Sequence, residues 1–426
     1  MKPIDVAKLA TISCKGLDLM EKLVVIGAGA AGVFGAINAK LNNPSISVEV
    51  LEGSRRPLNK VKISGGGRCN LTHHCFDPKK LVENYPRGRR ELLGSFHRFQ
   101  PQDTLKWFNS RGVDTKVEAD GRMFPVTNNS QTIIDCLLGE LDRLSIPLHK
   151  GAIVKSVSRN EGRFTIQYGK GEELTADKVL LTTGSAPIGF KVAASLGHTI
   201  VDPVPSLFTF NIEDPLLDGL AGQSFSQSSL KLSFAGSKKS FQQEGPLLIT
   251  HWGLSGPGVL KLSAFAAKEL FDSNYQASLR ANFLAKKQGQ ILEEIQALQK
   301  SNPSKQMAKT APEGLSKRFW ARFLEVQGLS VDKPWQELGP KQAKSLAENL
   351  SSYGFQVSGK GQYKDEFVTC GGVKLGEVDF RTMESKTCPG LYLAGEILNI
   401  DGVTGGFNFQ NAWTSSWIAA QAIAER

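Results

Sequence analysis

A glycine turn near the N-terminal end constrains the fold of this chain of 426 residues more than any other stretch. The apolar run at residues 23–26 leads into GAGAAG at 27–32, and a helix of small residues follows. A second apolar run at 46–51 then ends on Glu52. Strand, glycine turn, helix, strand and acid in this order are typical of a dinucleotide-binding unit. The stretch therefore predicts an α/β domain of Rossmann type.

The small residues of this turn have separate predicted roles. Gly27 permits the tight turn, Gly29 lets the backbone approach a pyrophosphate, and Gly32 lets the helix pack closely on the strand. The N–H groups at the helix start, around Ala31, would face the phosphates with the positive end of the helix dipole. Glu52 would accept hydrogen bonds from the adenosine ribose. A glycine turn without a ligand is the weaker alternative, because strand, helix and acid are all present.

A second glycine-rich run follows Glu52. Its three successive glycines remove side chains where the backbone must lie flat against something large. The flanking serine, arginine and asparagine supply hydrogen-bond donors. We interpret the run as a loop along the pyrophosphate that reaches the edge of a flavin ring; the alternative is a flexible surface loop. The cofactor contacts predicted here are Lys60, Ser64, Gly65, Gly66, Gly67, Arg68, Cys69 and Asn70.

Two later segments are predicted to complete the site. An apolar strand ends at Gly184, and a buried strand at 390–396 ends on an acid placed to bond the ribityl chain. The glycine turn at 401–412 opens a last helix, whose start would stabilise negative charge on a reduced flavin. Turns kept for packing are the alternative. The further cofactor contacts are Gly184, Gly395, Glu396, Gly406, Phe407 and Asn408, and Gln410 is expected as a polar neighbour of the flavin.

The length of the chain favours two structural units. We expect an FAD-binding Rossmann-type domain at 21–205 and 367–426, interrupted by an insert domain at 206–366 that begins after a proline-rich run at 202–205. The insert should contain antiparallel strands, with mostly helical structure at about 259–349. Residues 1–20 contain no apolar run typical of a secretory signal and are expected to be a flexible extension.

Composition restricts the class of protein. No stretch approaches about 18 uninterrupted apolar residues, so no membrane span is expected. The six cysteines have no metal-like spacing, which predicts reduced thiols in a cytoplasmic protein and no metal site. The formal charge of +10 raises nucleic acid as a partner. Lysine and arginine are dispersed, however, so a solvated cationic face is favoured and nucleic acid is considered unlikely.

Several motifs together resemble a bacterial flavoprotein family that includes aminoacetone-oxidase-like enzymes and flavin-dependent bile-acid steroid reductases. The matching motifs are GAGAAG at 27–32, SGGGRCN at 64–70, GRMFP at 121–125, THWGLSGPGVLKLS at 250–263, TCGGV at 369–373 and PGLYLAGEILNIDGVTGGFNFQNA at 389–412. The resemblance implies non-covalent FAD and an insert made of a six-stranded antiparallel barrel with a helical bundle. Departures include Leu58, near an expected glycine, His73, where asparagine is common, and a shortened loop at 185–190.

Two functional hypotheses follow. The first is an FAD-dependent oxidoreductase acting on a small organic substrate between the FAD domain and the insert, with the flavin supplying the chemistry. No catalytic acid or base is predicted, although Arg68 could bind a phosphate or a substrate anion. The second is a flavin protein that binds or modifies RNA through a basic insert.

The number of dinucleotide-binding units in the sequence bears on which molecule donates electrons to the flavin. Only one strand-anchored GxGxxG occurs, so no dedicated NAD(P)H site is expected and nicotinamide would act at most through the substrate cleft. An oxidase or dehydrogenase is therefore slightly favoured over an NAD(P)H-driven reductase of an enone or steroid-like substrate. The substrate and the oligomeric state stay open.

Overall fold

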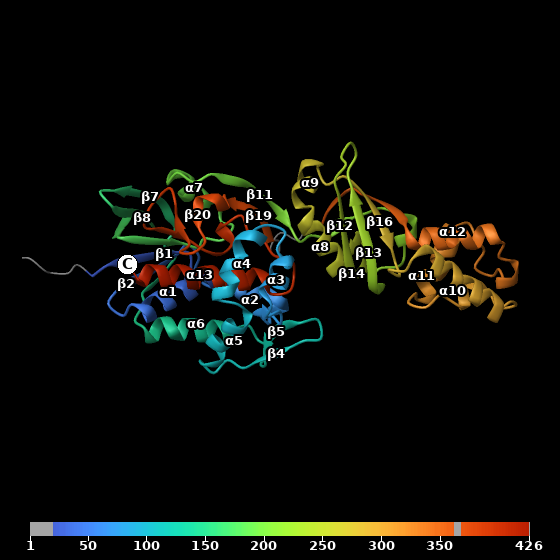
Figure 1. Ribbon diagram of the computed structural model, residues 1–426, viewed down its shortest axis with the longest axis horizontal. Coiled ribbons are helices and arrows are strands. Elements are labelled where there is room, and N and C mark those ends of the chain that lie inside the picture. Colours follow the sequence, from blue (N-terminus) through green and yellow to red (C-terminus); the bar gives the residue numbers. More distant parts are fainter. Residues whose placement is uncertain (1–19, 362–367, 426) are drawn as a thin grey trace, which may run out of the picture.

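The computed structural model describes residues 20–361 and 368–425. Figure 1 shows an elongated molecule with two parts along its longest axis. We call residues 20–205 and 368–425 the nucleotide part and residues 206–361 the insert. The extension predicted at 1–20 lies outside the described residues apart from Met20, as does the expected boundary between 366 and 367.

A sheet with the strand order β20-β21-β22-β10-β1-β2-β6 forms the centre of the nucleotide part. Strands β22, β10, β1, β2 and β6 run parallel, and β1 is joined to β2 through α1. Leu23, Val24 and Val25 of β1 are completely buried, which is why this central strand is a continuous apolar run. The predicted strand–turn–helix–strand unit is confirmed, with β1 (Lys22–Ile26), α1 (Ala30–Asn42) and β2 (Ser47–Glu52).

The remaining elements of the nucleotide part surround this sheet. A three-stranded meander of β7, β8 and β9 and a small sheet of β3, β5 and β4 lie outside the main sheet. Helix α13 packs along α1, so the last helix of the chain returns to the first. The elements are α2 (Asn59–Gly67), β3 (Thr72–His73), α3 (Pro78–Leu81), α4 (Arg89–Arg98), α5 (Pro101–Asn109), β4 (Thr115–Val117), β5 (Arg122–Pro125), α6 (Gln131–Arg143), β6 (Leu148–Lys150), β7 (Val154–Asn160), β8 (Arg163–Tyr168), β9 (Glu172–Ala176), β10 (Lys178–Leu181), α7 (Pro187–Ser195), β20 (Val378–Asp379), β21 (Glu384–Ser385), β22 (Leu391–Leu393) and α13 (Phe407–Glu425).

The insert is a second sheet with helices at its far end (Figure 1). The strand order is β17-β16-β13-β14-β15-β12-β18, with antiparallel pairing throughout. Strands β17 and β18, at the two ends of this order, are consecutive in the chain and separated only by Ser358. The elements are β12 (Phe210–Asn211), β13 (Ser224–Ser233), β14 (Ser240–Thr250), β15 (Gly253–Ser255), α8 (Pro257–Phe265), α9 (Ala267–Asp272), β16 (Ala277–Asn282), α10 (Gln288–Ser301), α11 (Lys317–Val326), α12 (Pro340–Ser351), β17 (Tyr353–Val357) and β18 (Gly359–Lys360).

Two short strands were not predicted from the sequence. Strand β16 lies inside the interval expected to be mostly helical, and its buried residues Ala277, Leu279 and Ala281 alternate with exposed ones, which is the period of a strand. The other is β5, because Arg122–Pro125 of the GRMFP motif is a strand. Both strands are short, and a few residues of alternation are a weak signal beside neighbouring helical patterns.

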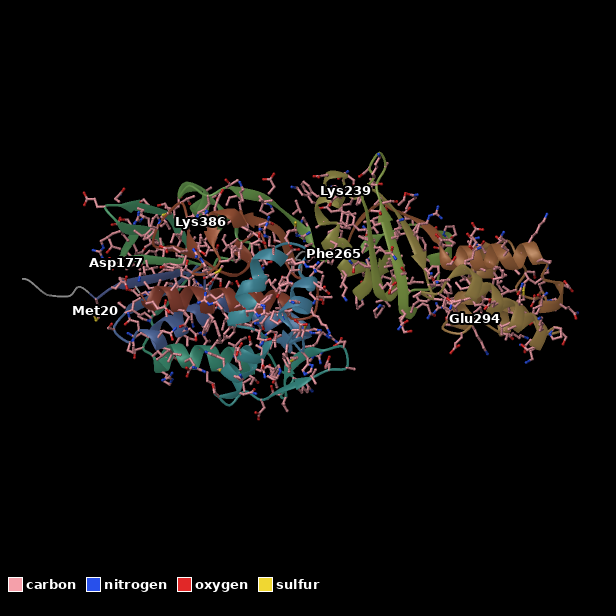
Figure 2. The ribbon with its side chains drawn as sticks, in the orientation of Figure 1. Met20, Asp177, Lys239, Phe265, Glu294 and Lys386 are labelled. Carbon is pink, nitrogen blue, oxygen red and sulfur yellow. The ribbon has the colours of Figure 1, made fainter. Side chains whose placement is uncertain are left out.

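Each part has its own hydrophobic core. Buried residues of the second core extend from Phe208 to Val357, whereas the first core is built almost entirely from the nucleotide part. A two-stranded ladder of β11 (Ile200–Ser206) and β19 (Val368–Val373) leads into and out of the insert. Figure 2 places Phe265 at the junction of the two parts and Glu294 among the distal helices. Among the described residues, no helix has the length and apolar character needed to cross a membrane.

Candidate functional site

The glycine turn between β1 and α1 leaves room for a ligand at one position and is tightly packed at the others. A Cβ atom on Gly27 would lie 2.6 Å from the Thr182 carbonyl oxygen, and one on Gly32 would lie 1.8 Å from the Gly27 carbonyl oxygen. At Gly29, by contrast, a Cβ atom would meet no atom within 4 Å. Gly29 is also the N-cap of α1 and provides no side-chain cap. The start of the helix therefore faces open space, and its N–H groups could donate hydrogen bonds to a pyrophosphate there.

Glu52 ends β2 beside this helix start. Its Oε2 accepts from the Ala28 amide at 2.7 Å and its Oε1 accepts from the Ser54 amide at 2.8 Å. These two bonds hold the carboxylate at the rim of a cavity of about 340 Å³ that α1 also lines. Each carboxylate oxygen has a second lone pair that a ribose hydroxyl can use.

Leu58 shows why a glycine is expected near this position. Its φ of 58° lies in the left-handed region, where a Cβ atom costs about 1–2 kcal/mol. The Leu58 amide donates to the Ala28 carbonyl at 2.9 Å, and the residue lines the same cavity. The chain thus bends sharply under the glycine turn at the expense of local backbone strain.

The second glycine run breaks helix α2. Helical geometry ends at Ser64, and Gly65 and Gly66 have φ values of 58° and 68°. A Cβ atom on Gly66 would meet no atom within 4 Å, so this backbone borders open space. Gly65 is tighter, because a Cβ atom there would lie 2.9 Å from the Phe124 ring. The predicted loop of bare backbone is therefore present at this place.

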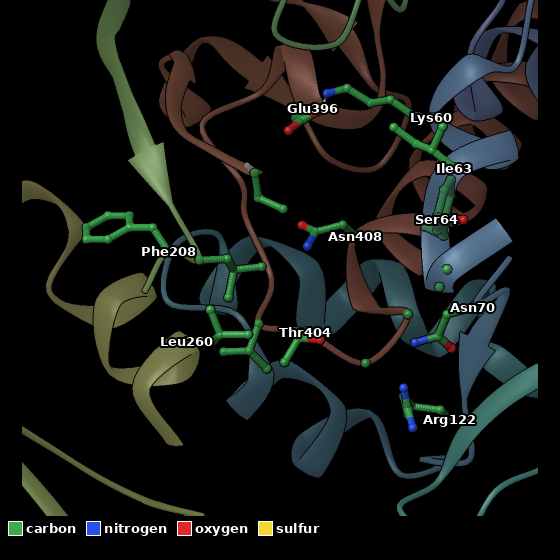
Figure 3. Close-up of a pocket in the computed structure, with 18 of the residues that line it drawn as sticks. Lys60, Ile63, Ser64, Asn70, Arg122, Phe208, Leu260, Glu396, Thr404 and Asn408 are labelled. Atoms are coloured by element: carbon green, nitrogen blue, oxygen red, sulfur yellow. Dashed lines mark hydrogen bonds and ion pairs between the residues drawn. The ribbon is translucent and has the colours of Figure 1, made fainter. Parts of the chain in front are cut away.

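Gly65 and Gly66 line a second cavity of about 570 Å³, shown in Figure 3. Its other wall comes from the insert and includes Leu207, Phe208 and Leu260. The two cavities share four lining residues: Lys60, Glu396, Asn408 and Phe409. They are consequently two sections of one groove, which begins beside Glu52 and ends between the nucleotide part and the insert.

An ion pair lies where the two sections meet. Lys60 Nζ is 2.5 Å from Glu396 Oε2 and donates to Ser185 Oγ at 3.2 Å. Glu396 Oε1 accepts from the Thr369 amide at 3.2 Å. Opposite them, a Cβ atom on Gly184, whose φ is 59°, would lie 3.6 Å from Glu396 Oε2. Polar groups of both signs thus surround the middle of the groove, where the ribityl chain and pyrophosphate of FAD would need partners.

Two asparagines hold the glycine loops of the second section. With its amide oriented to satisfy both groups, Asn70 accepts from the Gly406 amide at 2.9 Å and donates to the Thr72 carbonyl at 3.1 Å. The Asn408 side chain accepts from the Gly402 amide at 2.8 Å and donates to the Gly402 carbonyl at 2.9 Å. The Asn70–Gly406 bond holds the turn before α13 against the run at 64–70, and the Asn408 bonds hold the start of α13 against the preceding turn.

Arg122 is a charged residue at the end of the second section near Asn70 (Figure 3). Its Nε donates to Asp120 at 2.7 Å and its Nη2 donates to Glu118 at 3.0 Å. Glu118 also accepts from Arg68 at 2.6 Å, and the Arg68 guanidinium lies 4.0 Å from the centre of the Phe124 ring. The carboxylates orient Arg122, while Nη1 has no acceptor among the described residues.

Most of the predicted cofactor residues line the groove. Those that line at least one section are Gly27, Gly29, Ala31, Glu52, Lys60, Ser64, Gly65, Gly66, Asn70, Gly184, Gly395, Glu396, Gly406 and Asn408. Five predicted residues line neither section, and they are Gly32, Gly67, Arg68, Cys69 and Phe407.

The non-lining residues serve the surrounding structure. Gly32 packs against the turn, and Arg68 is paired with Glu118. Cys69 is completely buried, and burial raises the pKa of its thiol to about 12, so it stays protonated. Gln410 is also completely buried and bonds the hydroxyls of Thr72, Thr104 and Thr414, away from both sections.

The sequence interpretation missed the insert wall and Arg122. Ser255 and Leu260 belong to the segment 250–263, which matched the family pattern but received no role. Phe208 and Leu207 follow the proline-rich run that was interpreted only as a boundary. Arg122 belongs to GRMFP, another matching motif. The available signals were the match of 121–125 and 250–263 to the family pattern and, for Leu207 and Phe208, their position beside the domain boundary, where clefts form.

Comparisons with known proteins agree with this geometry. The ribosomal RNA dihydrouridine synthase of Escherichia coli is 28% identical over 409 residues, which are 94% of this chain and 97% of that protein. The 3-dehydro-bile acid delta(4,6)-reductase of Clostridium scindens is 28% identical over 420 residues, which are 96% of this chain and 100% of that protein. A ribosomal RNA dihydrouridine synthase of Haemophilus influenzae is also 28% identical, over 95% of this chain and 98% of that protein.

A family model described as the HI0933-like protein Rossmann domain matches residues 21–422. This span covers the insert and the whole nucleotide part except Met20 and residues 423–425. The protein therefore belongs to the HI0933-like family of FAD-binding Rossmann flavoproteins.

Proposed function

We propose that this protein is an FAD-dependent reductase that adds two hydrogens across a carbon–carbon double bond conjugated to a carbonyl group. Dihydrouridine differs from uridine by this saturation, and the delta(4,6) double bonds of a 3-dehydro bile acid are conjugated to its ketone. The names of both kinds of relative therefore describe one type of chemistry. On this ground we propose the reductive direction in place of the oxidase or dehydrogenase direction that the sequence slightly favoured.

The observation that carries the proposal is the continuity of the groove. It runs from Glu52, past the Lys60–Glu396 pair, to the space between the glycine loops and the insert. An extended dinucleotide fits such a path, with its adenosine at Glu52 and its flavin at Gly65, Gly66 and Gly406. When bound and reduced, FAD supplies a hydride to the substrate, and the second hydrogen arrives as a proton from solvent.

The insert wall would place the substrate and exclude water. Leu207, Phe208 and Leu260 present apolar side chains to the groove opposite the glycine loops. A flat, mostly apolar molecule fits between such surfaces, since apolar walls with few polar groups are typical of small-molecule sites. Removal of water also strengthens each hydrogen bond made inside the cleft.

Arg122 is our candidate for the polar group that orients the substrate. Its Nη1 can donate to the substrate carbonyl oxygen, on which negative charge develops when a hydride adds to the conjugated bond. Asp120 and Glu118 hold the guanidinium in place beforehand, so the donor needs little reorganisation.

Anaerobic reoxidation of the reduced protein tests the proposal. The FAD-loaded protein is reduced chemically, freed of reductant and mixed with a 3-keto-4-ene steroid, or separately with a uridine-containing ribosomal RNA fragment. We expect one of them to restore the oxidised flavin spectrum and to gain two hydrogens by mass spectrometry. A saturated ketone serves as the control, because it has no conjugated bond to reduce. The proposal would be contradicted if neither compound reoxidised the flavin and the enone gave the same absorbance trace as the saturated ketone.

The second candidate function is reduction of uridine within RNA, and the distal end of the insert favours it. The Trp335 amide donates to the Lys305 carbonyl at 3.1 Å, and Lys333 Nζ donates to Gln342 at 3.2 Å, so the loops after α10 and before α12 lie together. Exposed lysines gather on these loops and helix ends, namely Lys300, Lys305, Lys309, Lys341 and Lys344. Such a surface can bind phosphates without reading sequence.

Binding assays separate the two candidates. An RNA substrate predicts a gel shift that weakens steeply between low and moderate salt, and a Lys305→Glu/Lys341→Glu variant should lose it. The matched control, Lys155→Glu/Lys191→Glu, changes exposed lysines of the nucleotide part. If both variants weakened RNA binding equally, the binding would reflect general attraction between the positive protein and RNA. The distal surface would then not be the RNA-binding site.

Two structural proposals accompany the function. We propose that β17 and β18 close the insert sheet into a barrel, because this continuous segment pairs with β16 at one end of the order and with β12 at the other. We also propose that nicotinamide has no domain of its own, since the described residues contain one strand–glycine–helix unit of the dinucleotide type.

A further inference from the structure

We propose that a buried ion pair between Arg87 and Asp401 clamps the insert to the nucleotide part and so positions the substrate wall of the cleft. The positioning of substrate rests on the proposed function, whereas the clamp itself does not. Arg87 precedes α4, and Asp401 lies in the loop before α13, so the pair joins segments far apart in the chain.

The pair is bidentate and largely shielded from solvent. Arg87 donates through Nε to one Asp401 oxygen and through Nη2 to the other. The Asp401 side chain is 0% exposed and the Arg87 side chain is 19% exposed. The two residues also form an isolated antiparallel bridge through their backbones. A bidentate guanidinium–carboxylate pair fixes orientation as well as distance.

Both remaining contacts of the pair lead into the insert. Arg87 Nη1 donates to the Ala264 carbonyl of α8 at 2.8 Å, and Ser206 Oγ donates to Asp401 Oδ2 at 2.9 Å. Ser206 is the last residue of β11, where the chain enters the insert. One charged cluster thus ties the first linker and an insert helix to two segments of the nucleotide part.

These contacts adjoin the residues that wall the cleft. Leu207 follows Ser206 with a φ of 58°, a left-handed conformation that a leucine adopts only when its surroundings impose it. The Phe208 amide then donates to Ser263 Oγ at 3.0 Å, which links the linker to α8 again. Leu260 lies one turn before Ala264 on that helix. Movement of the cluster would therefore move all three apolar wall residues.

The opposite wall is tied to the same cluster. Asp401 is followed closely by Val403, Thr404 and Gly405, which line the cleft on the nucleotide side. The Val403 amide donates to the Asn84 carbonyl at 2.8 Å, so this loop is also anchored near Arg87. The pair therefore sets the spacing between the two walls directly.

Apolar packing supports a fixed junction. Ala264 of the insert belongs to the hydrophobic core of the nucleotide part, and Phe265 packs against that core. Phe265 is labelled at this junction in Figure 2. Val204, Ala267 and Cys370 form a separate small cluster between the two linker strands and α9. Removing the ion pair should leave these contacts, so the parts should loosen without unfolding.

Solution scattering of FAD-loaded variants tests the clamp without any substrate. Asp401→Ala leaves the buried Arg87 charge unpaired, which is the severe change, whereas Ser206→Ala removes one hydrogen bond and is the mild one. Arg89→Ala is the matched control, because Arg89 lies two residues from Arg87 and forms an exposed ion pair with Glu83. We expect the maximum dimension to rise for Asp401→Ala and to stay unchanged for Arg89→Ala, with the flavin spectrum retained.

Kinetics give the second measurement, with a 3-keto-4-ene steroid as the probe. Ser206→Ala and Asp401→Ala should raise KM, and Asp401→Ala should lower kcat/KM by on the order of tenfold to a hundredfold. If Asp401→Ala does not fold, Ser206→Ala carries the test through its KM and scattering. Unchanged scattering in a folded Asp401→Ala protein would overturn the clamp. Wild-type protein inactive on the probe would instead count against the proposed function alone.

Discussion

Replacement of Glu52 by alanine should weaken FAD binding while leaving the fold intact. Glu52 lines the first section of the groove at the end of β2, and its two oxygens already accept from Ala28 and Ser54. Loss of a hydrogen bond to a charged group costs about 1.5–3 kcal/mol. This corresponds to roughly a tenfold to hundredfold rise in Kd. Because the turn at Ala28 also loses its acceptor, we expect the upper part of this range.

Titration of apo-protein with FAD, followed by flavin fluorescence, measures the change. Glu52→Gln should lose less affinity than Glu52→Ala, since an amide oxygen can still accept one hydrogen bond. Glu49→Ala is a matched control on the same strand, because Glu49 pairs with Lys22 and His149 and does not line the groove. We expect that control to lose some stability and no FAD affinity. A Glu52→Ala protein with unchanged Kd, or a control with an equal loss, would refute the reasoning.

Three further predictions concern the cleft and the domains. Arg122→Gln should lower kcat for reduction of an enone by about a hundredfold, the scale of one lost oxyanion donor, with FAD affinity unchanged in the titration above. Anaerobic stopped-flow mixing with NADH and NADPH should bleach the flavin slowly and without saturation; fast bleaching that saturates at micromolar nicotinamide would reveal a dedicated site. Limited proteolysis should leave residues 202–205 uncut, because β11 pairs with β19 and its last residue, Ser206, is bonded to Asp401; rapid cutting there would argue against a fixed junction.

The glycine turn and the strand–helix–strand unit around it could be predicted because their pattern is local in the chain. GAGAAG, its flanking strands and Glu52 lie within about one βαβ unit, and each has a fixed structural role. The same holds for the run at 64–70, where successive glycines signal bare backbone whatever surrounds them. The structure places Gly29 and Gly66 against open space, as that reasoning requires.

The orientation of side chains was harder to predict. Asn408, Phe409 and Ala412 share the face of α13 that lines the groove, whereas Gln410 points into the core. Residues two apart on a helix lie on different faces, so the motif FNFQNA could not place all its polar groups at the flavin. Cys69 has a φ of 61° and its side chain is buried beneath the glycine run. Each motif therefore predicted where the backbone borders the groove, but it did not predict which of its side chains face the groove.

The wall that the insert contributes to the groove could not be predicted because it forms only in the tertiary structure. Leu207, Phe208 and Leu260 are apolar residues with no distinctive spacing, and they line the same cavity as the glycine loops. Strand β16 was missed for a related reason, since its alternation spans only Ala277–Asn282. Long-range packing decides such features, and short patterns carry little information about it.

The flavin content of the purified protein tests the central claim most directly. The protein should be yellow, and heat denaturation should release one FAD per chain, identified by chromatography against FMN and riboflavin. This outcome is expected because Glu52, the turn at Gly29 and the loop at Gly66 line one continuous groove. A colourless protein that gains no flavin absorbance after incubation with FAD would contradict the account.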